Sequence, residues 1–214
     1  MLFDRVLKAT SVFIAAVSVA TIVPLTMAVF GVGIPNPPTS GFFNGQDGSI
    51  QDQRGDVQPV LQRSNITVIP EIKDYHDVTS ASVRKAGGLF ELTINLAGNP
   101  NLNEKYETNY MWNVIYSNPD TGQIQNYVVM FPNFAPDFNH TVQGWYYAVF
   151  DRTGDVYVLP QTPIGNMPED RVEFNLDGAL IGNPSSFQFW VSVYTRVNST
   201  SFEDAPEYLM DYAP

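Results

Sequence analysis

Several acidic residues of this 214-residue chain are candidate ligands for a metal ion. Asp74 and Asp77 precede the run "VTSASV", while Glu203, Asp204 and Glu207 lie near the C-terminus in "FEDAPEY". Carboxylate oxygens are the ligands that Ca²⁺ prefers in proteins. A second interpretation needs no metal, because an aspartate before a strand can accept hydrogen bonds from its own backbone and an acidic terminal run can be a solvated tail.

Aromatic side chains offer a different chemistry, in which flat rings stack on sugar rings. The candidates are Trp112, Trp145, Tyr146 and Trp190. In "GWYYAVF" the alternation of a strand puts Tyr146 on the face opposite Trp145, so we expect one of these aromatics to face solvent. Core packing is the competing interpretation, because β domains also bury Trp and Tyr.

Three Asn-X-Ser/Thr sequons begin at Asn65, Asn139 and Asn198. Such asparagines are N-glycosylation acceptors only in a part of the chain that lies outside the cytoplasm. Their interpretation therefore depends on the topology of the N-terminal segment.

The motifs of common enzyme classes do not occur in the sequence. There is no nucleophile elbow, phosphate-binding loop or dinucleotide fingerprint, and the two histidines, His76 and His140, are far apart. Without cysteine, the chain has no disulfide, zinc–thiolate site or thiol nucleophile. A net charge of −11 disfavours nucleic acid and favours cations or basic partners. We expect a noncatalytic protein that does not bind nucleic acid.

Residues 1–34 carry a targeting or anchoring element. Arg5 and Lys8 precede an uncharged apolar run whose core, residues 12–34, is long enough for a helix that spans a membrane. A cleaved secretory signal ending near Ala28 and a pilin-like signal cut before Thr10 are the alternatives. In each case the positive residues stay in the cytoplasm and the rest of the chain lies outside, either membrane-anchored or secreted.

Residues 35–64 are rich in Pro, Gly, Gln and Asp and show no apolar period, which is typical of a linker. Phe42 and Phe43 are the exception in this stretch. They are either an incidental pair in a loop or a contact that docks on the domain or on a neighbouring subunit.

Residues 65–214 are predicted to form one all-β domain, an antiparallel sandwich of immunoglobulin or jelly-roll type. In "LFELTINL" the apolar residues alternate with polar ones, as a half-buried strand requires. The connections "SNPDTGQ" and "DRTGD" predict hairpins in which a late glycine supplies a positive φ. The expected strands are 66–69, 78–84, 89–96, 106–116, 124–131, 144–150, 156–159, 171–176 and 187–197.

The succession of "DVTSASV", the aromatic strand "YETNYMWNVIY", and "FEDAPEY" or "MDYAP" near the C-terminus resembles the extracytoplasmic sandwich domains of the DOMON and family 9 carbohydrate-binding module group. The resemblance covers residues 70–214 and implies the sandwich fold. Domains of this group bind sugars, haem or calcium, or only present a surface. The resemblance also implies that the two ends of the domain meet, which would pool Asp74 and Asp77 with the C-terminal carboxylates in a calcium site.

We therefore expect a binding or interaction module that meets a protein or glycan partner at the cell surface. One alternative is a carbohydrate-binding module. Another is a homo-oligomeric subunit of a surface filament or layer, in which residues 29–43 add a strand to the next copy. The runs "QNYVVMF" and "FQFWVSVYT" lack Lys and would accept a strand as edges, whereas Pro35, Pro37 and Pro38 would limit the donor to short pieces.

Overall fold

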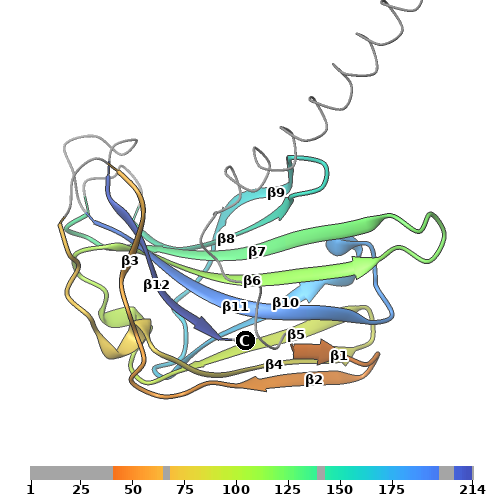
Figure 1. The fold of residues 1–214 in the computed structure, drawn as a ribbon, viewed down its shortest axis with the longest axis horizontal. Helices are drawn as coiled ribbons and strands as arrows, with labels where there is room; N and C mark the ends of the chain where they lie inside the picture. Colours follow the sequence, from red (N-terminus) through yellow and green to blue (C-terminus); the bar gives the residue numbers. More distant parts are fainter. Residues whose placement is uncertain (1–40, 65–67, 139–142, 198–204, 214) are drawn as a thin grey trace, which may run out of the picture. The chain divides into compact units, whose positions relative to one another are not determined.

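The computed structural model describes residues 41–64, 68–138, 143–197 and 205–213, all within one compact unit, Pro37–Pro214. The regular structure of this part of the chain is β-strand apart from three short 3₁₀ helices (Figure 1). Within these ranges no helix has the length and apolar character needed to cross a membrane. The predicted anchor at residues 12–34 lies outside them.

The strands are β1 (Gly41–Phe43), β2 (Asp47–Gln51), β3 (Val60–Arg63), β4 (Val78–Ala86), β5 (Leu89–Leu96), β6 (Glu107–Ser117), β7 (Ile124–Phe134), β8 (Gly144–Asp151), β9 (Val156–Pro163), β10 (Arg171–Asp177), β11 (Phe187–Arg196) and β12 (Glu207–Ala213).

The strands form two antiparallel sheets, which confirms the predicted all-β, antiparallel class. The larger sheet has the order β3-β12-β11-β6-β7-β8-β9, and β1 pairs with β11 beside it. The smaller sheet has the order β10-β5-β4-β2 and lies below the larger one in Figure 1. The 3₁₀ helices η1 (Asp74–His76), η2 (Pro100–Leu102) and η3 (Gly178–Ile181) lie in the connections.

The two sheets share one hydrophobic core. On β5 the residues Phe90, Leu92 and Ile94 are buried while the polar residues between them are partly exposed, as the alternation predicts. Across the layers, Phe131 of β7 meets Phe174 of β10 with ring centroids 5.4 Å apart. Aromatic pairs of this kind contribute about 0.5–1.5 kcal/mol beyond the burial of their area. The core therefore joins the sheets through aromatic contacts.

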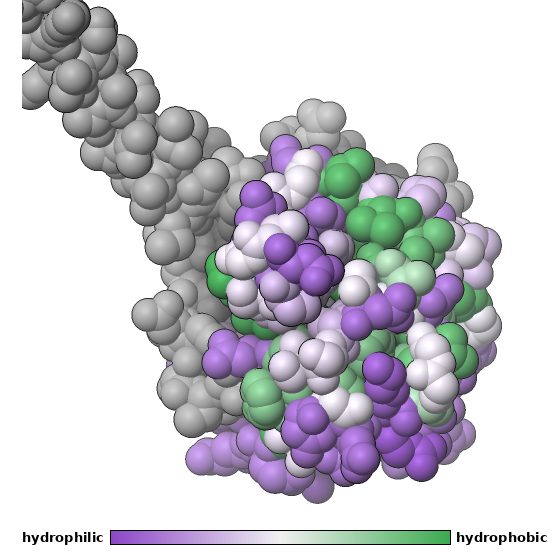
Figure 2. Space-filling view, turned by 90° about the vertical axis from the view of Figure 1, so that its right-hand side faces the viewer, coloured by the Kyte–Doolittle hydropathy of each residue, from purple (hydrophilic) through white to green (hydrophobic). Residues whose placement is uncertain are grey.

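The outward face of the smaller sheet is polar. Arg84 of β4 and Glu91 of β5 form an exposed ion pair, and Asn95 donates to Ser80 over 2.8 Å. Figure 2 shows mainly hydrophilic residues along its lower part, where β2 and β4 lie. One buried and one polar face are what the alternation of an antiparallel sheet predicts.

The prediction that residues 35–64 form a linker is wrong from Gly41 onward. In this segment β1 pairs with β11, β2 with β4 and β3 with β12. Phe43 is completely buried, and its ring stacks on Phe187 with centroids 4.7 Å apart. Gly41 and Gly48 are required by packing, because a Cβ at Gly41 would lie 2.5 Å from Ile50 Cγ2 and one at Gly48 would lie 2.5 Å from the Phe42 carbonyl oxygen. Phe43 therefore docks on its own domain.

Both predicted hairpins are present, joining β6 to β7 and β8 to β9. In the first loop Gly122 takes the expected positive φ of 70°, but in the second loop Asp155, not Gly154, has a positive φ, of 52°. Eight of the nine expected strands correspond to strands β4 to β11, whereas residues 68–69 are not in a strand and 66–67 lie outside the described ranges. Strand β12 was not predicted.

The two runs considered as sheet edges are interior strands. "QNYVVMF" belongs to β7, between β6 and β8, and "FQFWVSVYT" belongs to β11, between β6 and β12. Their lack of Lys therefore reflects an interior position, where both backbone edges are already paired. The ends of the strand order are β3 and β9 in the larger sheet.

Candidate functional site

Of the five predicted metal ligands, the structure describes Asp74, Asp77 and Glu207, and the carboxylate group that converges among the described residues contains none of these three. Asp74 begins η1 and Asp77 follows it, on the side of the domain where β4 starts. Glu207 of β12 is held by Arg196, whose guanidinium donates to it over 2.7 Å and to Glu107 over 2.5 Å. Glu203 and Asp204 lie outside the described residues. Among the described residues, Glu207 therefore has an arginine partner in place of a metal ion.

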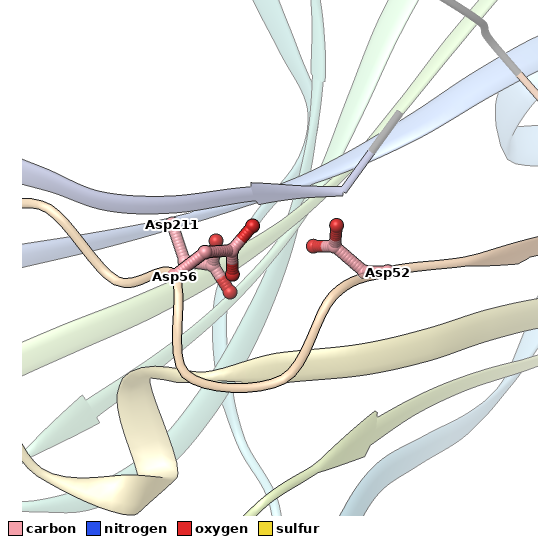
Figure 3. A group of neighbouring side chains, drawn as sticks. All are labelled: Asp52, Asp56 and Asp211. Atoms are coloured by element: carbon pink, nitrogen blue, oxygen red, sulfur yellow. The ribbon is translucent and has the colours of Figure 1, made fainter.

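A different group of carboxylates does converge. Asp52, Asp56 and Asp211 each offer a carboxylate oxygen, and these atoms lie within 4.8 Å of one another. Figure 3 shows the Asp56 and Asp211 side chains next to each other and the Asp52 carboxyl turned toward them. The first two residues lie in the connection from β2 to β3, and the third lies on β12. This is the arrangement that the predicted site lacked.

Backbone contacts hold the loop that carries Asp52 and Asp56. The Asp52 N–H donates to a carbonyl of β4 over 3.0 Å, and the Gln58 N–H donates to a carbonyl of β12, also over 3.0 Å. Between them, Gly55 turns the chain with φ 84° and donates its N–H to Asp77 Oδ2 over 2.8 Å. The Asp77 carboxyl is thereby fixed against the loop that carries Asp52 and Asp56.

Asp211 is positioned by a bulge in β12. Asp211 is paired with Val193 of β11, but the next pair is Leu209 with Tyr194, so Met210 is the extra residue. A bulge of this kind redirects the side chains of a strand. The buried Asp211 carboxyl accepts from Val78 N–H over 2.6 Å through Oδ2 and from Tyr212 N–H over 2.7 Å through Oδ1.

Burial and mutual repulsion make ionisation of these carboxyls unfavourable. Burial raises the pKa of Asp211 to about 7, and the charges of Asp52 and Asp56 add to the effect. Burial also raises the pKa of Asp52 to about 6, with further contributions from Asp56 and Asp77. The pKa of Asp77 is raised chiefly by burial, against the hydrogen bond from Gly55 and the charge of Arg54. A positive charge beside these carboxyl groups would therefore be electrostatically favourable.

The aromatic residues proposed for sugar stacking are mostly in the core. Trp112 is fully buried and stacks on Phe189 with centroids 4.8 Å apart. Trp145 is buried and donates Nε1–H to Asn101 Oδ1 over 2.9 Å. Burial contradicts a sugar-stacking role for these two rings. Trp190 is also buried, whereas Tyr146 is partly exposed and makes an edge-to-face contact with Phe134.

His76, which precedes Asp77 in the chain, is a buried and hydrogen-bonded residue. His76 is completely buried, accepts from Lys73 N–H at Nδ1 over 3.2 Å, and bonds Thr195 Oγ1 through Nε2 over 3.2 Å. Because Nδ1 accepts, Nε2 carries the proton and donates it to the threonine. Burial lowers the pKa of His76 to about 3. The ring is therefore a neutral hydrogen-bonding element.

An apolar surface lies at the β9 edge of the larger sheet. Val156, Tyr157 and Val158 are exposed there, with Val156 at 53% of its full area, and Ile124 at the start of β7 is exposed as well. Among the described residues β9 pairs only with β8. The three sequon asparagines, Asn65, Asn139 and Asn198, lie outside the described ranges.

The sequence carried a weak signal for part of the carboxylate group. "DQRGD" places two aspartates, Asp52 and Asp56, on either side of an Arg-Gly turn, but the composition of residues 35–64 predicts a linker there. Asp211 has no local signal, because a single acidic residue in a terminal apolar run does not indicate which neighbours it will meet. Only the pairing of β12 with the rest of the sheet brings it to the loop.

Comparison of the chain with protein-family models, curated proteins and solved structures found no match. The resemblance to the DOMON and family 9 carbohydrate-binding module group therefore stays a prediction. Function is inferred from the described residues and from the sequence.

Proposed function

We propose that this chain is a noncatalytic β-sandwich module that works outside the cytoplasm by contacting another protein. The two packed antiparallel sheets with a shared core support the sandwich, and an immunoglobulin-like or jelly-roll type is part of the proposal. The apolar segment at residues 12–34, preceded by Arg5 and Lys8, supports delivery to the cell surface, either anchored or secreted.

The observation that carries the proposal is the apolar edge at β9. Edge strands are normally protected by Lys, Pro, bulges or a covering element, because their free N–H and C=O groups accept further strands. In β9 the two prolines, Pro160 and Pro163, lie in the second half, and the first half carries one irregularity, a register shift against β8 at Val158. The first half, residues 156–159, has neither charge nor proline and exposes Val156, Tyr157 and Val158.

The partner best matched to this edge is the β9 of a second copy. Antiparallel pairing about a twofold axis would bring the uncharged residues 156–159 of one chain against the same residues of the other. Apolar side chains would then meet apolar side chains. The earlier candidate donor is less suited, because its last residues, Gly41–Phe43, already pair with β11 of their own chain. Pairing of identical edges closes a dimer and does not extend a filament.

The oligomeric state of the full chain tests this function. We expect light scattering after size exclusion to show a dimer whose fraction rises with protein concentration. The double substitution Val156→Lys and Val158→Lys should leave a monomer, because Lys blocks strand addition. The matched control is Val60→Lys on β3, the opposite edge, where Val60 is 50% exposed, and it should dimerise like the unmodified chain.

Two outcomes would contradict the assignment of β9. One is a chain that stays monomeric at every concentration reached. The other is a dimer that survives both β9 substitutions but is lost in Val60→Lys, which would transfer the contact to β3.

A further inference from the structure

We propose that Asp52, Asp56, Asp77 and Asp211 form a Ca²⁺ site that ties the connection between β2 and β3 to the start of β4 and to β12. This site lies away from β9 in the strand order and does not depend on the interaction proposed above. It also differs from the calcium site expected from sequence, of whose five residues it keeps only Asp77.

The first observation is the convergence of hard oxygen donors. The oxygens of Asp52, Asp56 and Asp211 lie within 4.8 Å of one another, a spacing that a single ion can bridge with small side-chain movements (Figure 3). Calcium takes six to eight oxygen ligands in flexible geometries. The described cluster contains carboxylates and no imidazole, and the chain has no thiol, so the donor set suits a hard cation and not zinc.

The second observation is a buried carboxylate oxygen without a partner. Asp77 is only 5% exposed, and its Oδ2 accepts the Gly55 N–H between the two loop aspartates. Its Oδ1 is buried and has no hydrogen-bond donor among the described residues. Oδ2 of Asp52 and Oδ1 of Asp56 share that condition. Buried polar atoms in native proteins almost always have a partner, and these three oxygens around one loop are free to coordinate a cation.

The charges around the group do not supply that ligand. Within the described ranges no Lys or Arg forms an ion pair with any of the four aspartates, and the charge of Arg54 lowers the pKa of Asp77 by less than burial raises it. One divalent cation would satisfy the orphan oxygens and remove the repulsion together. Calcium fits better than magnesium, because Mg²⁺ requires near-ideal octahedral geometry and retains several waters, whereas these donors come from three separate segments.

An ion here would hold together segments that are distant in sequence. Val78 and Asp211, which hydrogen-bond beside the site, are 133 positions apart. Because the unfolded chain cannot assemble these donors, Ca²⁺ binds the folded state and stabilises it. At a free concentration of about 100 times Kd, the expected rise in Tm is about 5–10 °C for a domain of this size.

The test uses the full chain after removal of metal with a chelator. We expect titration calorimetry with CaCl₂ at neutral pH to show one site per chain, MgCl₂ to bind more weakly, and CaCl₂ to raise Tm. Asp52→Asn and Asp56→Asn should each weaken calcium binding at least tenfold. Without metal these variants should melt at or above the Tm of the unmodified chain, because each removes a repelling charge while keeping the side-chain shape.

The matched control is Asp120→Asn, which changes an exposed aspartate in the hairpin between β6 and β7 and should retain full calcium binding. The proposal is overturned if CaCl₂ produces neither heat nor a Tm shift in the unmodified chain. It is also overturned if the two variants bind calcium as well as Asp120→Asn does, which would place the ion elsewhere, or if MgCl₂ binds more tightly than CaCl₂.

Discussion

Removal of the Phe43 ring tests whether the segment before β2 is part of the folded core. The side chain is fully buried, stacked on Phe187 at 4.7 Å and edge-on to Phe90 at 5.4 Å. In Phe43→Ala the core loses a complete aromatic ring and two ring contacts. Substitutions of this kind cost about 3–5 kcal/mol, because the lost transfer free energy is increased by the cavity left behind.

Urea denaturation of the full chain, followed by fluorescence, measures the effect. For a urea dependence of about 2 kcal/mol per molar, the expected loss lowers the unfolding midpoint by about 2 M. The neighbouring substitution Phe42→Ala is the matched control, because that ring is 58% exposed. Its effect should stay within about 0.5 kcal/mol, since surface substitutions away from special features change stability little.

The comparison separates a core strand from a spacer. If residues 41–43 were only a linker, both alanine variants would unfold at the same urea concentration as the unmodified chain. A midpoint for Phe43→Ala within about 0.3 M of that for Phe42→Ala would refute the reasoning.

Two further predictions concern a buried histidine and a turn. Because His76 has a pKa of about 3 when folded and about 6.5 when unfolded, only the unfolded chain takes up its proton between these values. The contribution of neutral His76 to the free energy of unfolding is complete above pH 6.5 and falls by about 1.4 kcal/mol per pH unit below it. An NMR titration of the His76 ring with a midpoint near pH 6.5 would contradict the burial argument. Gly122→Ala should cost about 1 kcal/mol in urea denaturation because φ is 70° there, whereas Gly88→Ala, at ordinary φ and with open space around its Cβ, should be near neutral; equal effects would argue against a strained turn.

The sequence by itself determined the local properties of this protein. Alternation of apolar and polar residues located β5 to within its observed ends, Leu89–Leu96, and the turn residues located both hairpins. Such patterns are readable because a strand's two faces and a turn's dihedral angles are fixed by residues close together in the chain.

Tertiary structure decided which strands are edges, which aromatics are covered and which carboxylates meet. The run that forms β11 lacks Lys, as an edge open to another strand would, yet β11 lies between β6 and β12. Trp112 has a ring that could stack on a sugar, yet it stacks on Phe189 in the core. Asp211 reaches the loop of Asp52 and Asp56 only because β12 joins the larger sheet with a bulge. Strand order and register depend on contacts between residues far apart in the chain, and those contacts leave no period in the local sequence.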